Sequence, residues 1–104
     1  SDVYKRQNYR HAFHVGNHAD VLKHAIVLYC LDALKKKPSP FAVLDTHAGR
    51  GLYDFLSDEA MRSPEWQDGI ARLWDWPDPP PLIARYLEAI RAFNADGALR
   101  TYPG

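Results

Sequence analysis

Phe41-Ala-Val-Leu-Asp45, followed directly by Thr46-His-Ala-Gly-Arg-Gly51, is the stretch that decides which fold this sequence predicts. A short apolar run without polar alternation is typical of a strand that is buried on both faces, as in a parallel sheet. The glycines of the following loop allow a ligand to approach the backbone closely. Because a helical pattern precedes the run, the order of helix, buried strand and glycine loop predicts an α/β fold.

The helical pattern occupies residues 19–37, where apolar residues recur at helical spacing. Asn17 is expected to be the N-cap, with Asp20 near the positive end of the helix. Pro38-Ser-Pro40 ends the pattern, since proline cannot continue a helix. Residues 8–16 are expected to form an extended or irregular arm before this helix.

After the loop, helical spacing returns over residues 64–76 and again over residues 82–94. The proline-rich segment 76–81 separates the two helices, and residues 99–102 are expected to begin a short strand. A buried parallel strand needs neighbours on both sides, and only one further strand candidate follows. The chain is therefore interpreted as the front part of a larger domain.

Composition limits the class of protein. The 104 residues suffice for one small domain, and 13 Lys and Arg balance 13 Asp and Glu. Residues 1–40 carry seven basic and three acidic residues, whereas residues 41–104 carry six and ten. A phosphate-binding surface would therefore lie in the N-terminal third, although an ordinary solvated face would have the same composition. The single cysteine excludes a disulfide scaffold, and the absence of a signal peptide or a long apolar run predicts a cytoplasmic protein.

The pattern Asp-x-x-x-Gly-x-Gly over residues 45–51 is neither a Walker loop nor the glycine fingerprint of nicotinamide-binding folds. An acidic residue at the end of the first strand, followed by a short glycine loop, suits S-adenosylmethionine, whose cationic amino-acid part favours a nearby carboxylate. An ordinary strand-to-helix turn is the alternative interpretation.

Four histidines, His11, His14, His18 and His24, lie close together in the sequence and raise the alternative of a zinc site. The spacing between His14 and His18 crosses the expected cap, and no His-Glu-x-x-His motif is present, so capping or buried histidines are favoured.

Two other features favour structural roles. Asp78-Pro-Pro-Pro81 superficially resembles the Asp-Pro-Pro-aromatic motif of amino-methyltransferases, but proline replaces the aromatic residue, so a linker between helices is expected. Trp74, Tyr86 and Phe93 fit the spacing of a helical core better than a base-stacking surface, and Cys30 is expected to pack inertly within its helix.

Two blocks carry a family resemblance: Tyr9-Arg-His-Ala-Phe-His-Val-Gly-Asn-His-Ala-Asp-Val-Leu-Lys-His24 and Leu44-Asp-Thr-His-Ala-Gly-Arg-Gly51. Together they closely resemble the RlmJ family of bacterial 23S ribosomal RNA (adenine-N6)-methyltransferases. The segments 69–74, 93–94 and 102–104 also follow that family in order and spacing.

The resemblance implies the N-terminal part of a Rossmann-like, S-adenosylmethionine-dependent methyltransferase that carries a helical insertion. Residues 1–7 would be a leader outside the family pattern, and residues 8–52 would begin the methyltransferase domain. Residues 53–98 would form the insertion, and residues 99–104 would return to the main domain.

The resemblance also implies a set of site residues. The cofactor would be bound by Lys23, His24, Asp45, His47, Gly49 and Gly51. The RNA would be contacted by Tyr9, Arg10 and His11. The partner would be 23S ribosomal RNA. The protein itself would be a monomer that binds neither a metal nor a membrane.

The family's catalytic Asp-Pro-Pro-Tyr motif is expected beyond residue 104, so no catalytic residue is assigned and the chain alone is expected to be inactive. The alternative from a different class is a non-catalytic, small RNA-binding or helical adaptor domain.

Overall fold

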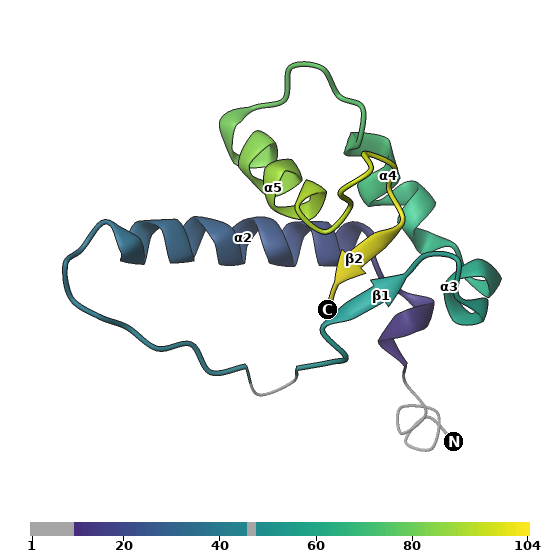
Figure 1. The fold of residues 1–104 in the computed structure, drawn as a ribbon, viewed down its shortest axis with the longest axis horizontal. Coiled ribbons are helices and arrows are strands. Elements are labelled where there is room, and N and C mark those ends of the chain that lie inside the picture. The colour runs from purple at the N-terminus through teal and green to yellow at the C-terminus, as the bar shows by residue number, and fades with distance from the viewer. Residues whose placement is uncertain (1–9, 46–47) are drawn as a thin grey trace.

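The computed structural model describes residues 10–45 and 48–104 and combines helices with one small sheet. In chain order the elements are η1 (His11–Phe13), α2 (His18–Lys35), β1 (Leu52–Asp54), α3 (Asp58–Arg62), η2 (Glu65–Asp68), α4 (Ile70–Leu73), α5 (Pro81–Arg91) and β2 (Thr101–Pro103). Figure 1 shows α5 alongside the long helix α2, with the two strands near the N-terminal end of α2.

The long helix and its boundaries confirm the prediction from the sequence. Asn17 caps α2, because its Oδ1 accepts the backbone N–H of Asp20 at 2.9 Å. The helix ends at Lys35, before Pro38. The helix predicted over residues 82–94 is confirmed as α5, which begins with Pro81 in its first turn and ends at Arg91. The proline-rich segment before it links α4 to α5 as expected.

The helix predicted over residues 64–76 is shorter than expected and is divided at Gly69 into η2 and α4. The division has a packing cause. The backbone of Gly16 and Asn17 lies so close to Gly69 that a Cβ at this position would overlap it. Ile70 N–H donates to the Gly16 carbonyl at 3.0 Å, so the break joins the start of α2 to the later helices.

The sheet differs from the predicted one. It is a two-stranded antiparallel ladder, in which Tyr53 of β1 pairs with Tyr102 of β2. The short strand expected near residues 99–102 is confirmed as β2, whereas η1, β1 and α3 were not predicted. The expectation of a buried strand over residues 41–45 is wrong for this structure: this segment has no strand structure and Leu44 is 87% exposed. A parallel strand requires neighbours to pair with, and the described part of the chain offers it none.

The core lies between α2, α5 and the sheet. Its largest fully buried side chains are Tyr86, Tyr102, Phe55, Ile70, Leu87, Ile90 and Val15. Trp74 and Tyr86 are buried, which confirms their predicted packing role, whereas Phe93 is 48% exposed and does not join the core. Cys30 is also exposed, so its predicted packing role is wrong here, because no described element covers that side of α2.

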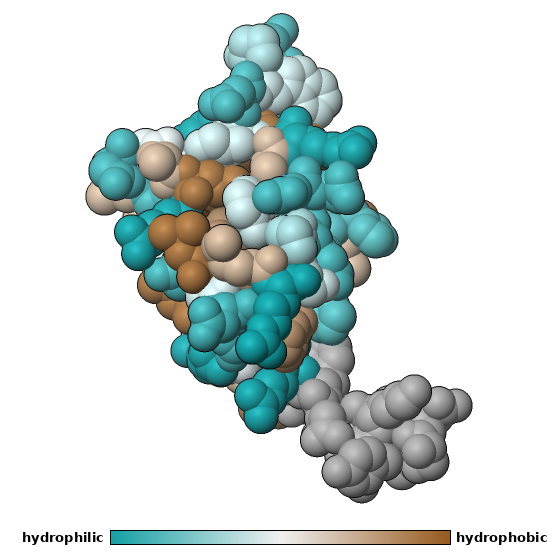
Figure 2. Space-filling model, turned by 90° about the vertical axis from the view of Figure 1, so that its right-hand side faces the viewer, coloured by the Kyte–Doolittle hydropathy of each residue, from teal (hydrophilic) through white to brown (hydrophobic). Residues whose placement is uncertain are grey.

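A second group of apolar side chains remains open to solvent. This uncovered apolar surface comprises Leu22, Ile26, Val27, Tyr29, Leu34, Phe41, Val43 and Leu44. By contrast, the end of the molecule that carries α3 is largely hydrophilic, with apolar residues gathered in one band (Figure 2). Because α2 contributes apolar side chains both to the core and to this uncovered surface, it has the character of a helix that packs within a larger core. No helix within residues 10–45 and 48–104 is long and apolar enough to cross a membrane.

Candidate functional site

The start of α2 is built around the buried carboxylate of Asp20, which is 3% exposed. Asp20 Oδ2 accepts the backbone N–H of Gly16 at 2.9 Å and lies 2.7 Å from His11 Nε2. Asp20 Oδ1 lies 3.4 Å from Lys23 Nζ. A buried charge is tolerated only where such partners satisfy it, so Asp20 fixes His11 and Lys23 relative to each other.

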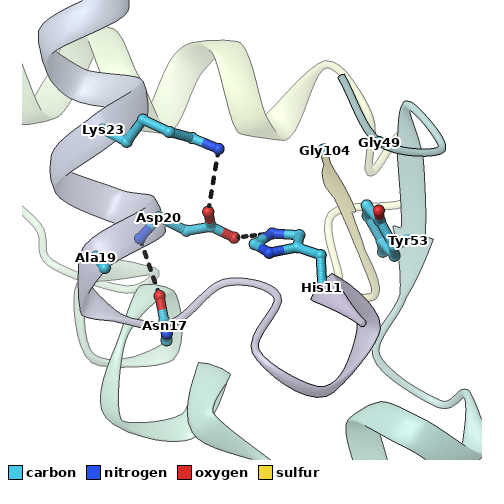
Figure 3. Close-up of a pocket in the computed structure, with 8 residues that line it drawn as sticks. All are labelled: His11, Asn17, Ala19, Asp20, Lys23, Gly49, Tyr53 and Gly104. Carbon is cyan, nitrogen blue, oxygen red and sulfur yellow. Dashed lines mark hydrogen bonds and ion pairs between the residues drawn. The ribbon is translucent and has the colours of Figure 1, made fainter. Parts of the chain in front are cut away.

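A pocket of about 360 Å³ opens around this cluster. It is lined by His11, Asn17, Ala19, Asp20, Lys23, Gly49, Tyr53 and Gly104. Figure 3 shows the Asp20 carboxylate between Lys23 and His11, with Tyr53 of β1 on the opposite side. The rings of His11 and Tyr53 meet edge to face, with their centroids 5.3 Å apart. This pocket therefore has one aromatic wall and one charged wall.

A second pocket of about 470 Å³ is lined by Lys23, His24, Val27, Val43, Leu44, Asp45 and Gly104. Because Lys23 and Gly104 line both pockets, the two are neighbours. The second pocket combines a cationic side chain, an imidazole and a carboxylate with three aliphatic side chains. Its volume is within the range of small-molecule sites, and such mixed linings can bind a ligand that has both charged and apolar parts.

His24 of α2 is held by the core behind this pocket. Its Nδ1 lies 2.9 Å from the Tyr102 hydroxyl, and the two rings are 5.2 Å apart. Burial is the largest cause that lowers the pKa of His24, and the charges of Lys23 and His11 lower it further, whereas Asp20 opposes them. The imidazole is therefore held toward its neutral form.

The structure brings together part of the predicted set. Lys23, His24 and Asp45 line the second pocket, and His11, Lys23 and Gly49 line the first. Gly51 lines neither pocket. It adopts a φ of +92°, which favours glycine, and its carbonyl accepts the Gly104 N–H at 2.8 Å, so it joins the glycine loop to the end of β2.

The other predicted site residues are Arg10, Tyr9 and His47. Arg10 is exposed just before η1 and lines neither pocket. The predictions for Tyr9 and His47 fall outside the described residues.

The zinc alternative finds no support in residues 10–45 and 48–104, where no group of three or more His, Cys, Asp or Glu side chains could hold a metal ion. His11 lies against Asp20, and His14 Nδ1 lies 2.8 Å from Glu65 Oε2. Both rings thus have carboxylate partners that join the N-terminal arm to α2 and η2.

Sequence reasoning missed Asp20, Tyr53 and Tyr102 as parts of the site. The spacing of Asn17 and Asp20 is that of a capping box, in which the side chain of the later residue accepts a hydrogen bond from the backbone at the start of the helix. This signal could have drawn attention to Asp20. Tyr53 and Tyr102 had no such local signal, because the antiparallel pairing of β1 and β2 brings them to the site.

Comparison with known proteins gives consistent matches. The family model described as "RsmJ: Ribosomal RNA large subunit methyltransferase D, RlmJ" matches residues 38–104. A protein of Escherichia coli (strain K12) named ribosomal RNA large subunit methyltransferase J is 48% identical over 97 residues. A protein of the same name from Haemophilus influenzae is 48% identical over 98 residues. Each match covers 93% of this chain, and the chain spans 35% of the length of either relative.

Proposed function

Because this chain belongs to the RlmJ family of ribosomal RNA large subunit methyltransferases, we propose that it is the N-terminal part of a longer enzyme that methylates ribosomal RNA. The reaction is transfer of a methyl group from S-adenosylmethionine to the N6 amine of an adenine in 23S ribosomal RNA. The observation that carries the proposal is the pocket that unites Lys23, His24 and Asp45, beside a second pocket that contains His11. The enzyme would act in the cytoplasm as a monomer.

The lining of the second pocket fits the proposed cofactor. The Asp45 carboxylate suits its cationic groups, the Lys23 ammonium suits its carboxylate, and the aliphatic side chains suit the apolar faces of its adenosine. Gly49, Gly51 and His47 would complete the cofactor loop. When bound, S-adenosylmethionine supplies an electrophilic methyl group on a sulfonium.

The substrate side is proposed for the first pocket and the N-terminal arm. Tyr9, Arg10 and His11 would contact RNA, and Lys23 would stand between the RNA and the cofactor because it lines both pockets. An adenine amine is a weak nucleophile that must be unstacked and held in line with the methyl group, so adjacent pockets for the two reactants suit the reaction. The chain contains no Asp-Pro-Pro-Tyr motif, and we assign no catalytic residue within it.

The domain boundaries proposed for the longer protein have structural support. Residues 53–98 would be a helical insertion in a Rossmann-like domain that begins with residues 8–52 and resumes at residues 99–104, after the leader 1–7. The pairing of β1 with β2 brings the two ends of the insertion together. The uncovered apolar surface on α2 and residues 41–44 is where the sheet of the longer protein would pack.

The test uses the full-length protein, labelled S-adenosylmethionine and protein-free ribosomal RNA. We expect labelled N6-methyladenine in the 23S RNA and saturable cofactor binding by calorimetry. Transfer to protein or DNA, with none to RNA, would overturn the substrate class. Absence of cofactor binding would favour the adaptor alternative, which the names of both relatives do not support.

A further inference from the structure

We propose that Tyr102, itself held by Tyr86, fixes the imidazole proton of His24 on Nε2 and thereby directs an N–H donor into the second pocket. Tyr102 is then a positioning residue, and Tyr86 gives the buried Tyr102 hydroxyl a second hydrogen-bond partner. The inference rests on the proposed function, because that function supplies the ligand, S-adenosylmethionine, whose acceptor atoms would meet the donor.

Three elements of the fold meet in this arrangement. His24 lies on α2, Tyr102 on β2 and Tyr86 on α5. The Tyr102 hydroxyl oxygen is 2.9 Å from His24 Nδ1 and 2.7 Å from the Tyr86 hydroxyl oxygen. Both tyrosines are fully buried, so their hydroxyl groups depend on each other and on His24 for hydrogen bonds.

A count of protons decides the direction of this chain. Each tyrosine hydroxyl has one proton to donate. If Tyr86 donates to Tyr102 and Tyr102 donates to His24 Nδ1, both protons are used and the imidazole proton resides on Nε2. In the reverse direction His24 Nδ1–H donates to Tyr102, Tyr102 donates to Tyr86, and the Tyr86 proton has no acceptor among the residues that the structure describes. A buried donor without a partner is costly, so the first direction is favoured.

The charge state of His24 is consistent with this count. A protonated imidazole would donate from Nδ1 and leave the Tyr86 proton unpaired in the same way. Burial lowers the pKa of His24, as do Lys23 and His11, while Asp20 raises it. Burial also raises the pKa of both tyrosines, which keeps their hydroxyl groups protonated.

The consequence concerns the pocket. His24 lines it, and Nε2 has no hydrogen-bond partner within residues 10–45 and 48–104. An Nε2–H at this position is a donor available to a bound ligand.

The experiment compares the full-length wild-type protein with Tyr102→Phe, Tyr86→Phe and the control Tyr29→Phe, which alters an exposed tyrosine of the same helix as His24. The nitrogen NMR shifts of His24 report the tautomer without cofactor, and calorimetry reports the Kd for S-adenosylmethionine.

We expect the Nε2–H tautomer in the wild type and in Tyr86→Phe, where Tyr102 still donates to His24. Tyr102→Phe should lose the tautomer preference and weaken cofactor binding about fivefold to tenfold, the size expected for one lost hydrogen bond. Tyr29→Phe should change neither readout.

An Nδ1–H tautomer in the wild type would overturn the inference, as would Tyr102→Phe with unchanged nitrogen shifts and Kd. If Tyr102→Phe does not fold, the wild type and Tyr86→Phe still decide the tautomer. A wild type with the expected tautomer that fails to bind S-adenosylmethionine would instead overturn the proposed function, so the two failures are distinguishable.

Discussion

The two sides of α2 differ in whether other parts of the structure cover them. The side that faces α5 and the sheet packs into a closed core whose tyrosines, phenylalanine and aliphatic residues are buried. The other side, together with residues 41–44, presents apolar side chains to solvent, including Tyr29 at 65% exposure. Apolar residues of α2 thus occur on both sides. The difference therefore shows which apolar side chains of α2 are covered within residues 10–45 and 48–104 and which are not.

The largest expected effect tests the closed side. Phe55 is fully buried and stacks on Trp66 with ring centroids 4.7 Å apart. Replacement of Phe55 by alanine should lower the free energy of unfolding by about 3–5 kcal/mol, because it leaves a cavity. Urea titration of the full-length protein measures this loss. The matched control is Phe93→Ala at a half-exposed position. Equal losses of unfolding free energy in both variants would contradict the assignment of Phe55, and not Phe93, to the core.

The next effect tests the open side. If the longer protein covers the uncovered apolar surface, Leu44→Asp should cost about 2–4 kcal/mol in the full-length protein, because it places a charge where an apolar side chain is buried. Leu56→Asp is the matched control, since Leu56 is also exposed but lies outside this surface. Similar urea midpoints for the two variants would mean that the surface stays open to solvent.

A smaller effect is expected where the two pockets meet. Asp20→Asn keeps the size of the side chain but removes the carboxylate that His11 and Lys23 share. Loss of these charge-assisted contacts should cost about 1–3 kcal/mol of stability and should weaken cofactor binding. Thermal melting and calorimetry measure the two effects. Asp32→Asn, in the ion pair with Arg85 on the same helix, is the control, and it should leave cofactor binding unchanged.

The smallest effect is a dependence of stability on pH. The pKa of His24 is lowered in the folded protein, mainly by burial, so the unfolded chain binds a proton at higher pH than the folded chain does. The contribution of His24 to stability is present above the ordinary histidine pKa of 6.5 and is lost as the pH falls through the lowered value.

Comparison of urea midpoints between pH 7.5 and about pH 5 tests this dependence, and His24→Gln should flatten it. His18→Gln, at an exposed position of the same helix, serves as the control. An unchanged slope in His24→Gln would show that other groups cause the dependence.

Prediction from the sequence succeeded where local signals were complete. The cap at Asn17, the proline stop after α2 and the proline-rich break before α5 each act within a few residues, so their effects follow from the local chain. It failed for the strand at residues 41–45, for Cys30 and for Phe93, because burial depends on what lies across from a residue. Periodicity shows that a side chain is apolar but does not show whether a partner covers it.

The residues of the candidate site also fall into two groups, those that the sequence pointed to and those that it did not. The sequence pointed to Lys23, His24 and Asp45 through a family resemblance, and the structure lines one pocket with all three. It did not point to Tyr53 or Tyr102, since each approaches α2 only through the pairing of β1 with β2.

The sequence by itself determined the long helix α2 with its cap and proline stop, the presence of α5, and membership in the RlmJ family, because propensity, capping and motif are properties of neighbouring residues. Only the tertiary structure decided that Asp20 joins His11 to Lys23 and that His24 meets two buried tyrosines. Such contacts join residues far apart in the chain, and they form when burial removes competing water and leaves each polar group dependent on the partner that the fold supplies.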